Sequence, residues 1–253
     1  MKKISLIGIV ITSVLIFSSV CTASDKIVLA TGEWPPYTSE KMEGYGFFTE
    51  IVSAVFKEAG LEIEYKFYPW LRCEDAIQKG RAFAAFPYMI NEDRKAKYDF
   101  SDPLANSTGR FFYLKKNIKS DVVWETFEDL KNYKIGGTAG YWYEKAFKDA
   151  GIELDLAVSD ELGMKKLHGG RFDLLATDEL VGWDLIKTLF PTEIDNFAIV
   201  STPLNNDQLR LMVSRTYPDA QAITEKVNQA IKRIKDKGIY SEILKKYNVS
   251  EEI

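Results

Sequence analysis

The 253-residue chain is poor in the side chains that most metal sites and nucleophilic enzymes require. It has one histidine, His168, and two cysteines, Cys21 and Cys73. These numbers argue against a zinc site, and a Ser-His-Asp triad would have to use His168, although no Gly-x-Ser-x-Gly motif precedes a predicted helix. The glycine patterns of dinucleotide-binding and P-loop proteins are also missing. We therefore expect no metal, no cofactor and no catalytic residue, although counting carboxylates does not by itself exclude a glycosidase.

The chain also lacks an excess of positive charge. It has 33 Lys and Arg against 37 Asp and Glu, which gives a net charge of −4. Because nucleic-acid binding depends on basic surfaces, this balance argues against a nucleic acid as the main partner. A monomer with a small-molecule partner is expected instead.

The one long apolar run lies at the N-terminus. Met1, Lys2 and Lys3 form a positive start, apolar residues follow over 4–20, and small residues come next. This pattern predicts a signal peptide over residues 1–23, cleaved near Ala23, and export to the periplasm. A retained membrane anchor is the alternative, because the run is near the lower limit for spanning a bilayer.

Cleavage near Ala23 would leave Cys73 as the only cysteine. The exported chain then has no internal disulfide and depends on packing for its stability. Cys73 falls within a predicted helix over 70–80, where we expect a small packed residue and not a nucleophile.

Apolar periodicity alternates between strand and helix along the first third of the mature chain. The residues at 61, 63, 65 and 67 are apolar or aromatic and alternate as in a half-buried strand. The predicted elements follow the order strand, helix, strand, helix, strand over 26–31, 44–60, 61–68, 70–80 and 82–90. This order predicts a parallel sheet with crossover helices.

The same alternation restarts later in the chain. Strands are expected at 133–137, 153–159, 171–178 and 196–204, with helices at 139–151, 160–170, 179–190, 218–238 and 239–247. Residues 110–116 read as an extended crossing segment, and a second crossing near 199–204 would return the chain. We therefore expect an α/β protein of two lobes. Lobe 1 comprises residues 24–109 plus 204–253, and lobe 2 comprises residues 110–203.

Ligands of open α/β sheets bind beyond the carboxyl ends of the strands. The loops of interest are therefore 32–37, 87–94, 138–142 and 176–179. The first carries Glu33, Trp34 and Tyr37 beside two prolines. Trp34 could form an apolar wall or stack on a cation, with ordinary packing as the alternative.

Two charged residues stand out in these loops. Arg94 follows an apolar run, and its planar guanidinium suits a carboxylate, although an ion pair with Glu92 or Asp99 would explain it equally well. Asp178 ends a buried strand, where it could accept from an ammonium group, cap the next helix, or do both. Residues 135–142 place small residues before a helix, so free backbone N–H groups there could form a modest anion site.

Three stretches resemble the bacterial extracellular solute-binding proteins of family 3, the periplasmic receptors of polar-amino-acid ABC transporters. They are EDRKAKYDFSDPL, GGRFDLLATDE and the C-terminal VNQAIKRIKDKGIYSEILKKYN, and they occur in the family's order. The resemblance covers almost the whole mature chain. It implies a two-lobed periplasmic-binding-protein fold, in which each lobe has a mostly parallel sheet flanked by helices and two segments form the hinge.

The resemblance also implies roles for individual residues. Arg94 would hold the ligand α-carboxylate, Asp178 its α-ammonium group, and Trp34 its side chain. Gly140, Tyr141 and Trp142 fall where a backbone N–H and a small hydroxyl help to hold the carboxylate.

The chain departs from the family pattern in its aromatic residues. Tyr88 stands where many members carry small polar residues, and Tyr141 and Trp142 replace a usual threonine pair. Trp70 and Arg72 are expected near the same cleft. The pocket is thus unusually aromatic, which disfavours a ligand with a small, strongly polar side chain.

The implied function is capture of a small zwitterion by hinge closure and delivery to the permease of an ABC importer. An exported dehydratase on the same fold is one alternative, with Glu33 or Glu179 as the proton-transferring acid. A periplasmic sensor for a membrane signalling partner is another. A ligand with only one of the two charges also remains open.

Overall fold

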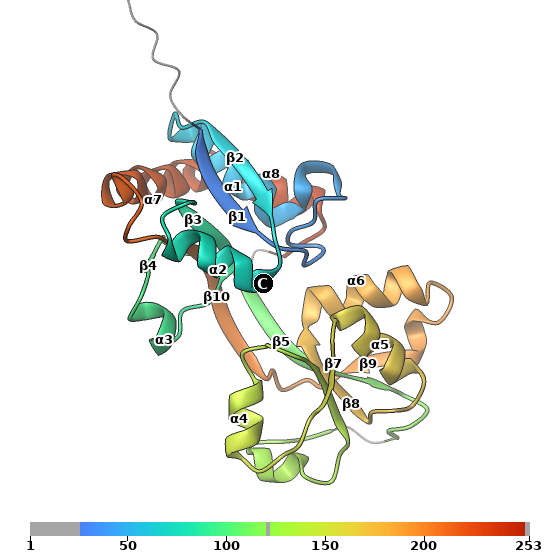
Figure 1. Cartoon of the computed structure of the whole chain (residues 1–253). Coiled ribbons are helices and arrows are strands. Elements are labelled where there is room, and N and C mark those ends of the chain that lie inside the picture. The colour runs from blue at the N-terminus through green and yellow to red at the C-terminus, as the bar shows by residue number, and fades with distance from the viewer. Residues whose placement is uncertain (1–25, 120–121, 251–253) are drawn as a thin grey trace, which may run out of the picture.

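The computed structural model describes residues 26–119 and 122–250. The signal peptide expected over residues 1–23, with cleavage near Ala23, lies outside this range. Figure 1 shows two α/β lobes joined by strands that run from one to the other. Within the described residues, no helix has the length and apolarity needed to cross a membrane.

The first lobe begins with the predicted alternation. Its elements are β1 (Ile27–Thr31), η1 (Glu43–Tyr45), α1 (Phe47–Glu58), β2 (Ile63–Phe67), α2 (Trp70–Gln78) and β3 (Ala84–Tyr88). β1 pairs in parallel with both β2 and β3, so the carboxyl ends of all three strands lie on one edge. The parallel sheet predicted for this lobe is confirmed for these strands.

The charged stretch after β3 folds into two short elements, α3 (Glu92–Lys95) and β4 (Asp99–Phe100). The Asn91 side chain begins α3 by accepting a hydrogen bond from the Arg94 backbone N–H at 2.8 Å. An asparagine at this position satisfies one of the free donors at the start of a helix. Arg94 is therefore presented by a capped helical turn.

Two long strands join the lobes: β5 (Ala105–Leu114) and β10 (Asn205–Val213). They pair antiparallel, with Asn205 opposite Gly109 and Leu209 opposite Ala105. Further along, β10 pairs antiparallel with β3 and β4, whereas β5 pairs antiparallel with β8 and β9. β10 was not predicted as a strand, although a return of the chain near this point was.

The second lobe contains most of the remaining elements. They are η2 (Phe127–Leu130), β6 (Ile135–Thr138), α4 (Glu144–Asp149), β7 (Asp155–Ala157), α5 (Asp160–His168), β8 (Leu174–Asp178), α6 (Glu179–Leu189), η3 (Ile194–Asn196) and β9 (Phe197–Ile199). β6 pairs in parallel with β7 and β8. The main sheet order through both lobes is β2-β1-β3-β10-β5-β8-β6-β7.

Helices cover both faces of each half of this sheet. α7 (Ala220–Asp236) and α8 (Ile239–Lys246) return to the first lobe and pack with α1, while α2 covers the opposite face. In the second lobe, alternate residues of β5 enter different cores: Phe111 lies with α4, and Phe112 with α5 and α6. Such alternation is expected of a strand buried on both faces.

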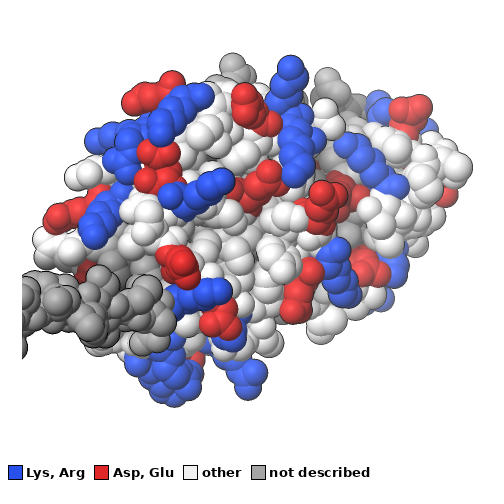
Figure 2. Space-filling view, turned by 90° about the horizontal axis from the view of Figure 1, so that it is seen from above, with Lys and Arg blue, Asp and Glu red and all other residues white. Residues whose placement is uncertain are grey.

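Charged side chains are mixed over the face drawn in Figure 2, where basic and acidic groups alternate without a large patch of one sign. Charged groups of the described chain also form ion pairs, for example Arg233 and Lys237 with Glu58 at 2.8 and 2.7 Å. Such exposed pairs contribute little to stability individually. This face therefore shows no concentrated basic surface.

Candidate functional site

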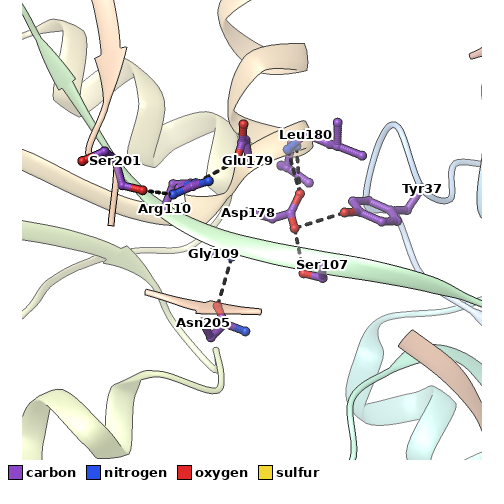
Figure 3. A network of polar contacts seen from close by, with 10 residues as sticks. Tyr37, Ser107, Gly109, Arg110, Asp178, Glu179, Leu180, Ser201 and Asn205 are labelled. Carbon is purple, nitrogen blue, oxygen red and sulfur yellow. Dashed lines mark hydrogen bonds and ion pairs between the residues drawn. The ribbon is translucent and has the colours of Figure 1, made fainter. Parts of the chain in front are cut away.

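Asp178 stands at the junction of β8 and α6, where it faces the first lobe. Its Oδ1 atom accepts hydrogen bonds from the backbone N–H groups of Leu180 at 2.9 Å and Val181 at 3.2 Å, which caps α6. Its Oδ2 atom accepts from the hydroxyls of Ser107 at 2.7 Å and Tyr37 at 3.1 Å (Figure 3). The predicted capping role is thus confirmed, and the second oxygen is held by hydroxyls of Ser107 and Tyr37.

Asp178 is only 6% exposed, and none of the described residues that donate hydrogen bonds to its carboxyl carries a positive charge. Burial raises its pKa to about 6, although its four hydrogen bonds oppose this. Burial, followed by the nearby Asp178 charge, raises the pKa of Tyr37 well above its ordinary value, so Tyr37 donates as a neutral phenol. Asp178 is therefore a buried acid without a cation.

Tyr37 reaches Asp178 from the loop after β1. The loop turns tightly, because the Trp34 N–H donates to the Thr38 carbonyl at 2.8 Å and the Thr38 hydroxyl donates to the Gly32 carbonyl at 2.6 Å. The Trp34 ring stacks on Tyr37, with centroids 4.2 Å apart. Glu33 is exposed and accepts from the Glu40 N–H at 2.8 Å, so it turns toward its own loop. Trp34 and Tyr37 thus form one aromatic unit beside Asp178.

The aromatic surface continues toward α2. A Cβ atom at Gly32 would lie 2.8 Å from the Trp70 ring, so the absence of a side chain there lets Trp70 pack against the end of β1. Trp70 meets Tyr88 edge-on at 5.8 Å, and the Tyr88 hydroxyl donates to the Trp70 carbonyl at 3.3 Å. Arg72 is exposed and lies 5.7 Å from the centre of the Tyr68 ring.

Arg94 lies at the other end of this aromatic surface. Its guanidinium carbon is 4.7 Å from the centre of the Tyr88 ring. Its two terminal nitrogens donate to the Met89 carbonyl and to Glu74 of α2, each at 3.3 Å. Arg94 pairs with Glu74, so the prediction of an ion pair with Glu92 or Asp99 was wrong. Contacts therefore run from Arg94 through Tyr88, Trp70 and the loop after β1 to Asp178.

The backbone N–H groups expected to be free after β6 are not free, which corrects the sequence-based hypothesis. Gly140 adopts a φ of +83°, and its N–H, together with that of Tyr141, donates to the carboxylate of Glu144. The Glu144 side chain reaches back from the first turn of α4 to these groups, as in a capped helix start. The turn does bind a carboxylate, but one supplied by the chain itself.

The hydroxyl of Tyr141 points to another acid, Asp160 at the start of α5. Asp160 also accepts from Thr138 at 2.8 Å and Thr177 at 3.2 Å, and burial raises its pKa. These bonds tie β6, α5 and β8 together. Tyr141 is therefore held by the second lobe's own polar network.

Trp142 lies closer to the hinge. This residue is 40% exposed, and its ring would lie 3.2 Å from a Cβ atom at Gly109 of β5. Gly109 also donates its N–H to Asn205 of β10 at 3.0 Å (Figure 3). Because Gly109 is paired with Asp178 across β5 and β8, Trp142 and Asp178 flank the same part of the hinge.

Sequence reasoning missed Ser107, Glu74 and Asp160. Ser107 carried no local signal for this contact, because its partner Asp178 lies 71 positions away in the chain. The pairing of Glu74 with Arg94 joins residues 20 positions apart on different helices, and no local pattern predicts it. Within residues 26–119 and 122–250, no group of three or more His, Cys, Asp and Glu side chains is placed to hold a metal ion.

The fold and sequence match known binding proteins. The chain is 24% identical over 225 residues to the L-cystine-binding protein TcyA of Bacillus subtilis, covering 85% of this chain and 78% of the relative. An ancestral arginine-binding protein bound to arginine has a similar structure, with a TM-score of 0.71, 26% identity, and coverage of 87% and 97%. A histidine kinase sensor domain with similarity to periplasmic binding proteins matches in fold, with a TM-score of 0.75, 19% identity, and coverage of 88% and 95%.

These likenesses confirm the two-lobed periplasmic-binding-protein fold that was expected from the sequence. The model of one family, the bacterial extracellular solute-binding proteins, family 3, matches residues 27–250. This range takes in both lobes, the two joining strands and the Asp178 and Arg94 sites. The chain therefore belongs to the bacterial extracellular solute-binding proteins, family 3.

Proposed function

We propose that this protein is a periplasmic receptor that captures a small zwitterion, an amino acid, between its lobes and delivers it to an ABC importer. The observation that carries the proposal is the Asp178 carboxylate, which is buried at the hinge and contacts no basic group of the described chain. A buried acid without a cation is unfavourable. A ligand ammonium group would remove that cost.

The ligand carboxylate would bind at Arg94. This guanidinium is partly exposed, with 27% of its side-chain surface accessible, and it lies beside the aromatic surface that leads to Asp178. Trp34, Trp70 and Tyr88 of this surface would contact the ligand side chain. Glu33, Tyr37 and Arg72, with Gly140, Tyr141 and Trp142 of the second lobe, complete the set of residues proposed around the ligand.

Binding would be coupled to hinge closure. We place lobe 1 at residues 24–109 plus 204–253 and lobe 2 at residues 110–203, with β5 and β10 as the hinge segments. Because Arg94 and Asp178 lie on different lobes, only the closed form pairs both charges of the ligand. The ligand then favours the closed state by its higher affinity for it, and a permease can recognise that shape.

The relatives support this proposal. TcyA is named an L-cystine-binding protein, and the ancestral protein was seen with arginine bound. We infer that the present chain is likewise a binding protein without catalytic activity, works as a monomer, and loses its signal peptide near Ala23. An affinity near micromolar, about −8 kcal/mol, is expected for such a receptor.

Isothermal titration of the mature protein against L-amino acids tests the proposal, after unfolding and refolding to remove copurified ligand. Arg94→Ala and Asp178→Asn should each lose about 2–4 kcal/mol of binding energy, because each leaves one ligand charge unpaired. The controls are Arg81→Ala, which removes another paired arginine of lobe 1, and Asp184→Asn on α6. Wild-type affinity in both site variants, or turnover of the ligand, would contradict the proposal.

A further inference from the structure

Arg94 already holds a carboxylate. The Oε1 atom of Glu74 lies 3.3 Å from its guanidinium, and 34% of the Glu74 side-chain surface is accessible. Glu74 sits one turn after Trp70 on α2, so it faces the same stretch of lobe 1 as the proposed ligand site. A ligand carboxylate at Arg94 would therefore share the guanidinium with Glu74 or displace it.

The charges of the site then do not balance for a plain zwitterion. Among the two groups assigned to the ligand charges together with Glu74, Arg94 contributes +1, while Glu74 and Asp178 contribute −1 each, which gives a net −1; the Asp160 carboxyl behind Tyr141 adds no positive charge. Arg110 and Glu179 beside Asp178 form a neutral pair at 2.7 Å. The exposed Arg72 and Glu33 at the rim carry opposite charges and cancel.

A zwitterion adds no net charge, so one negative charge stays unpaired when the lobes close. Enclosing an unpaired charge is costly, because the interior screens it less than water does. A ligand of net charge +1 restores neutrality. Since the proposed function already assigns the α-carboxylate and the α-ammonium group, the additional positive charge has to lie on the ligand side chain.

We propose that Glu74 is a specificity-determining residue, through which the site selects amino acids with a positively charged side chain over neutral ones of the same shape. This inference rests on the proposed function. The nearby rings suit such a ligand, because aromatic faces attract cations. The Tyr88 ring already has the Arg94 guanidinium 4.7 Å from its centre, and Trp70 meets Tyr88 edge-on.

The test uses two pairs of probes that differ in side-chain charge and little in shape: L-arginine with L-citrulline, and L-lysine with L-norleucine. Wild-type protein, stripped of ligand, should bind the cationic member of at least one pair tenfold or more tightly. Glu74→Gln should reduce that preference to about threefold or less, because the variant keeps the shape and removes the charge. Glu74→Asp should retain most of the preference.

Asp75→Asn is the matched control. Asp75 follows Glu74 on α2 and pairs with Lys79 and Arg81, so its loss should leave the ratio unchanged. Binding without preference for the cationic probe, or a preference that survives in folded Glu74→Gln, overturns the inference but leaves the proposed function standing. If stripped wild-type protein binds no amino acid at all, the proposed function fails and the inference falls with it.

Discussion

The affinity for an amino acid should depend on pH through Asp178. In the free protein its pKa is about 6, because the carboxyl is buried without a cation. A ligand ammonium group favours the ionised carboxylate and would lower this pKa in the complex. Free amino acids stay zwitterionic between about pH 5 and pH 8, so the ligand itself does not titrate in this range. Binding should therefore release a proton from Asp178 at low pH.

The expected magnitude follows from the fraction of ionised Asp178. With a pKa of about 6, nearly all molecules are ionised at about pH 8, but only about a tenth at pH 5. The apparent affinity should thus be about tenfold weaker at pH 5, a difference of about 1.4 kcal/mol. Asp178→Asn should bind more weakly and lose this pH dependence.

Calorimetric titrations at several pH values, each in buffers of different ionisation enthalpy, measure both the affinity and the protons released. His168→Gln is the control, because it removes the one histidine of the chain, which lies by Glu193 at the end of α5 and not at the site. Equal affinities at pH 5 and pH 8, with no proton release, would show that the ligand does not pair with Asp178.

The free protein provides a second readout. The folded pKa of Asp178, about 6, lies above the value of about 3.9 in an unfolded chain. Its protonated form therefore stabilises the fold below about pH 4, and this stability is lost as pH rises through 6. The shift of about two pKa units corresponds to about 3 kcal/mol. Urea unfolding of wild type and Asp178→Asn across this range should show the difference.

Two further substitutions, and a glycine control, test the surroundings of the site. Tyr37→Phe removes one of the four donors to Asp178, so the free energy of unfolding should fall by about 1 kcal/mol and the pKa of Asp178 should rise further, as read by urea unfolding and pH titration. Gly182→Ala places a Cβ atom 2.3 Å from the Phe112 ring, so it should cost about 1–3 kcal/mol of stability. In Gly169→Ala the nearest atom to the new Cβ is 3.4 Å away, so this control should cost less than about 1 kcal/mol. Equal stability of both glycine variants would refute the packing argument.

Much of the fold followed from local pattern. The helix α1 and the strand β2 were predicted because their apolar residues recur at helical and at alternating spacing, and Cys73 was correctly expected to be buried. β10 was missed, because Asn205–Val213 begins with four polar residues. Its strand form depends on pairing with β5 and β3, and not on its own apolar pattern.

The candidate site was predictable to the level of its loops. Asp178 as a helix cap and Trp34 as an aromatic on the tight loop after β1 each follow from residues close to them in the chain. The prediction of free N–H groups at Gly140 and Tyr141 was wrong, because both donate to the carboxylate of nearby Glu144. Strand ends indicate which loops gather, but not which side chains meet there.

The amino-acid sequence by itself determined most of the order of strands and helices, apart from β10, and the restart of the alternation that indicates two lobes, because these depend on periodicities within about 10–20 neighbouring residues. Only the tertiary structure decided that Tyr37 donates to Asp178 across 141 positions and that Glu74 pairs with Arg94. The physical reason is that a charge or hydroxyl is satisfied by whichever partner folding brings within about 3 Å. That choice depends on the packing of whole lobes, which no short stretch of the chain specifies.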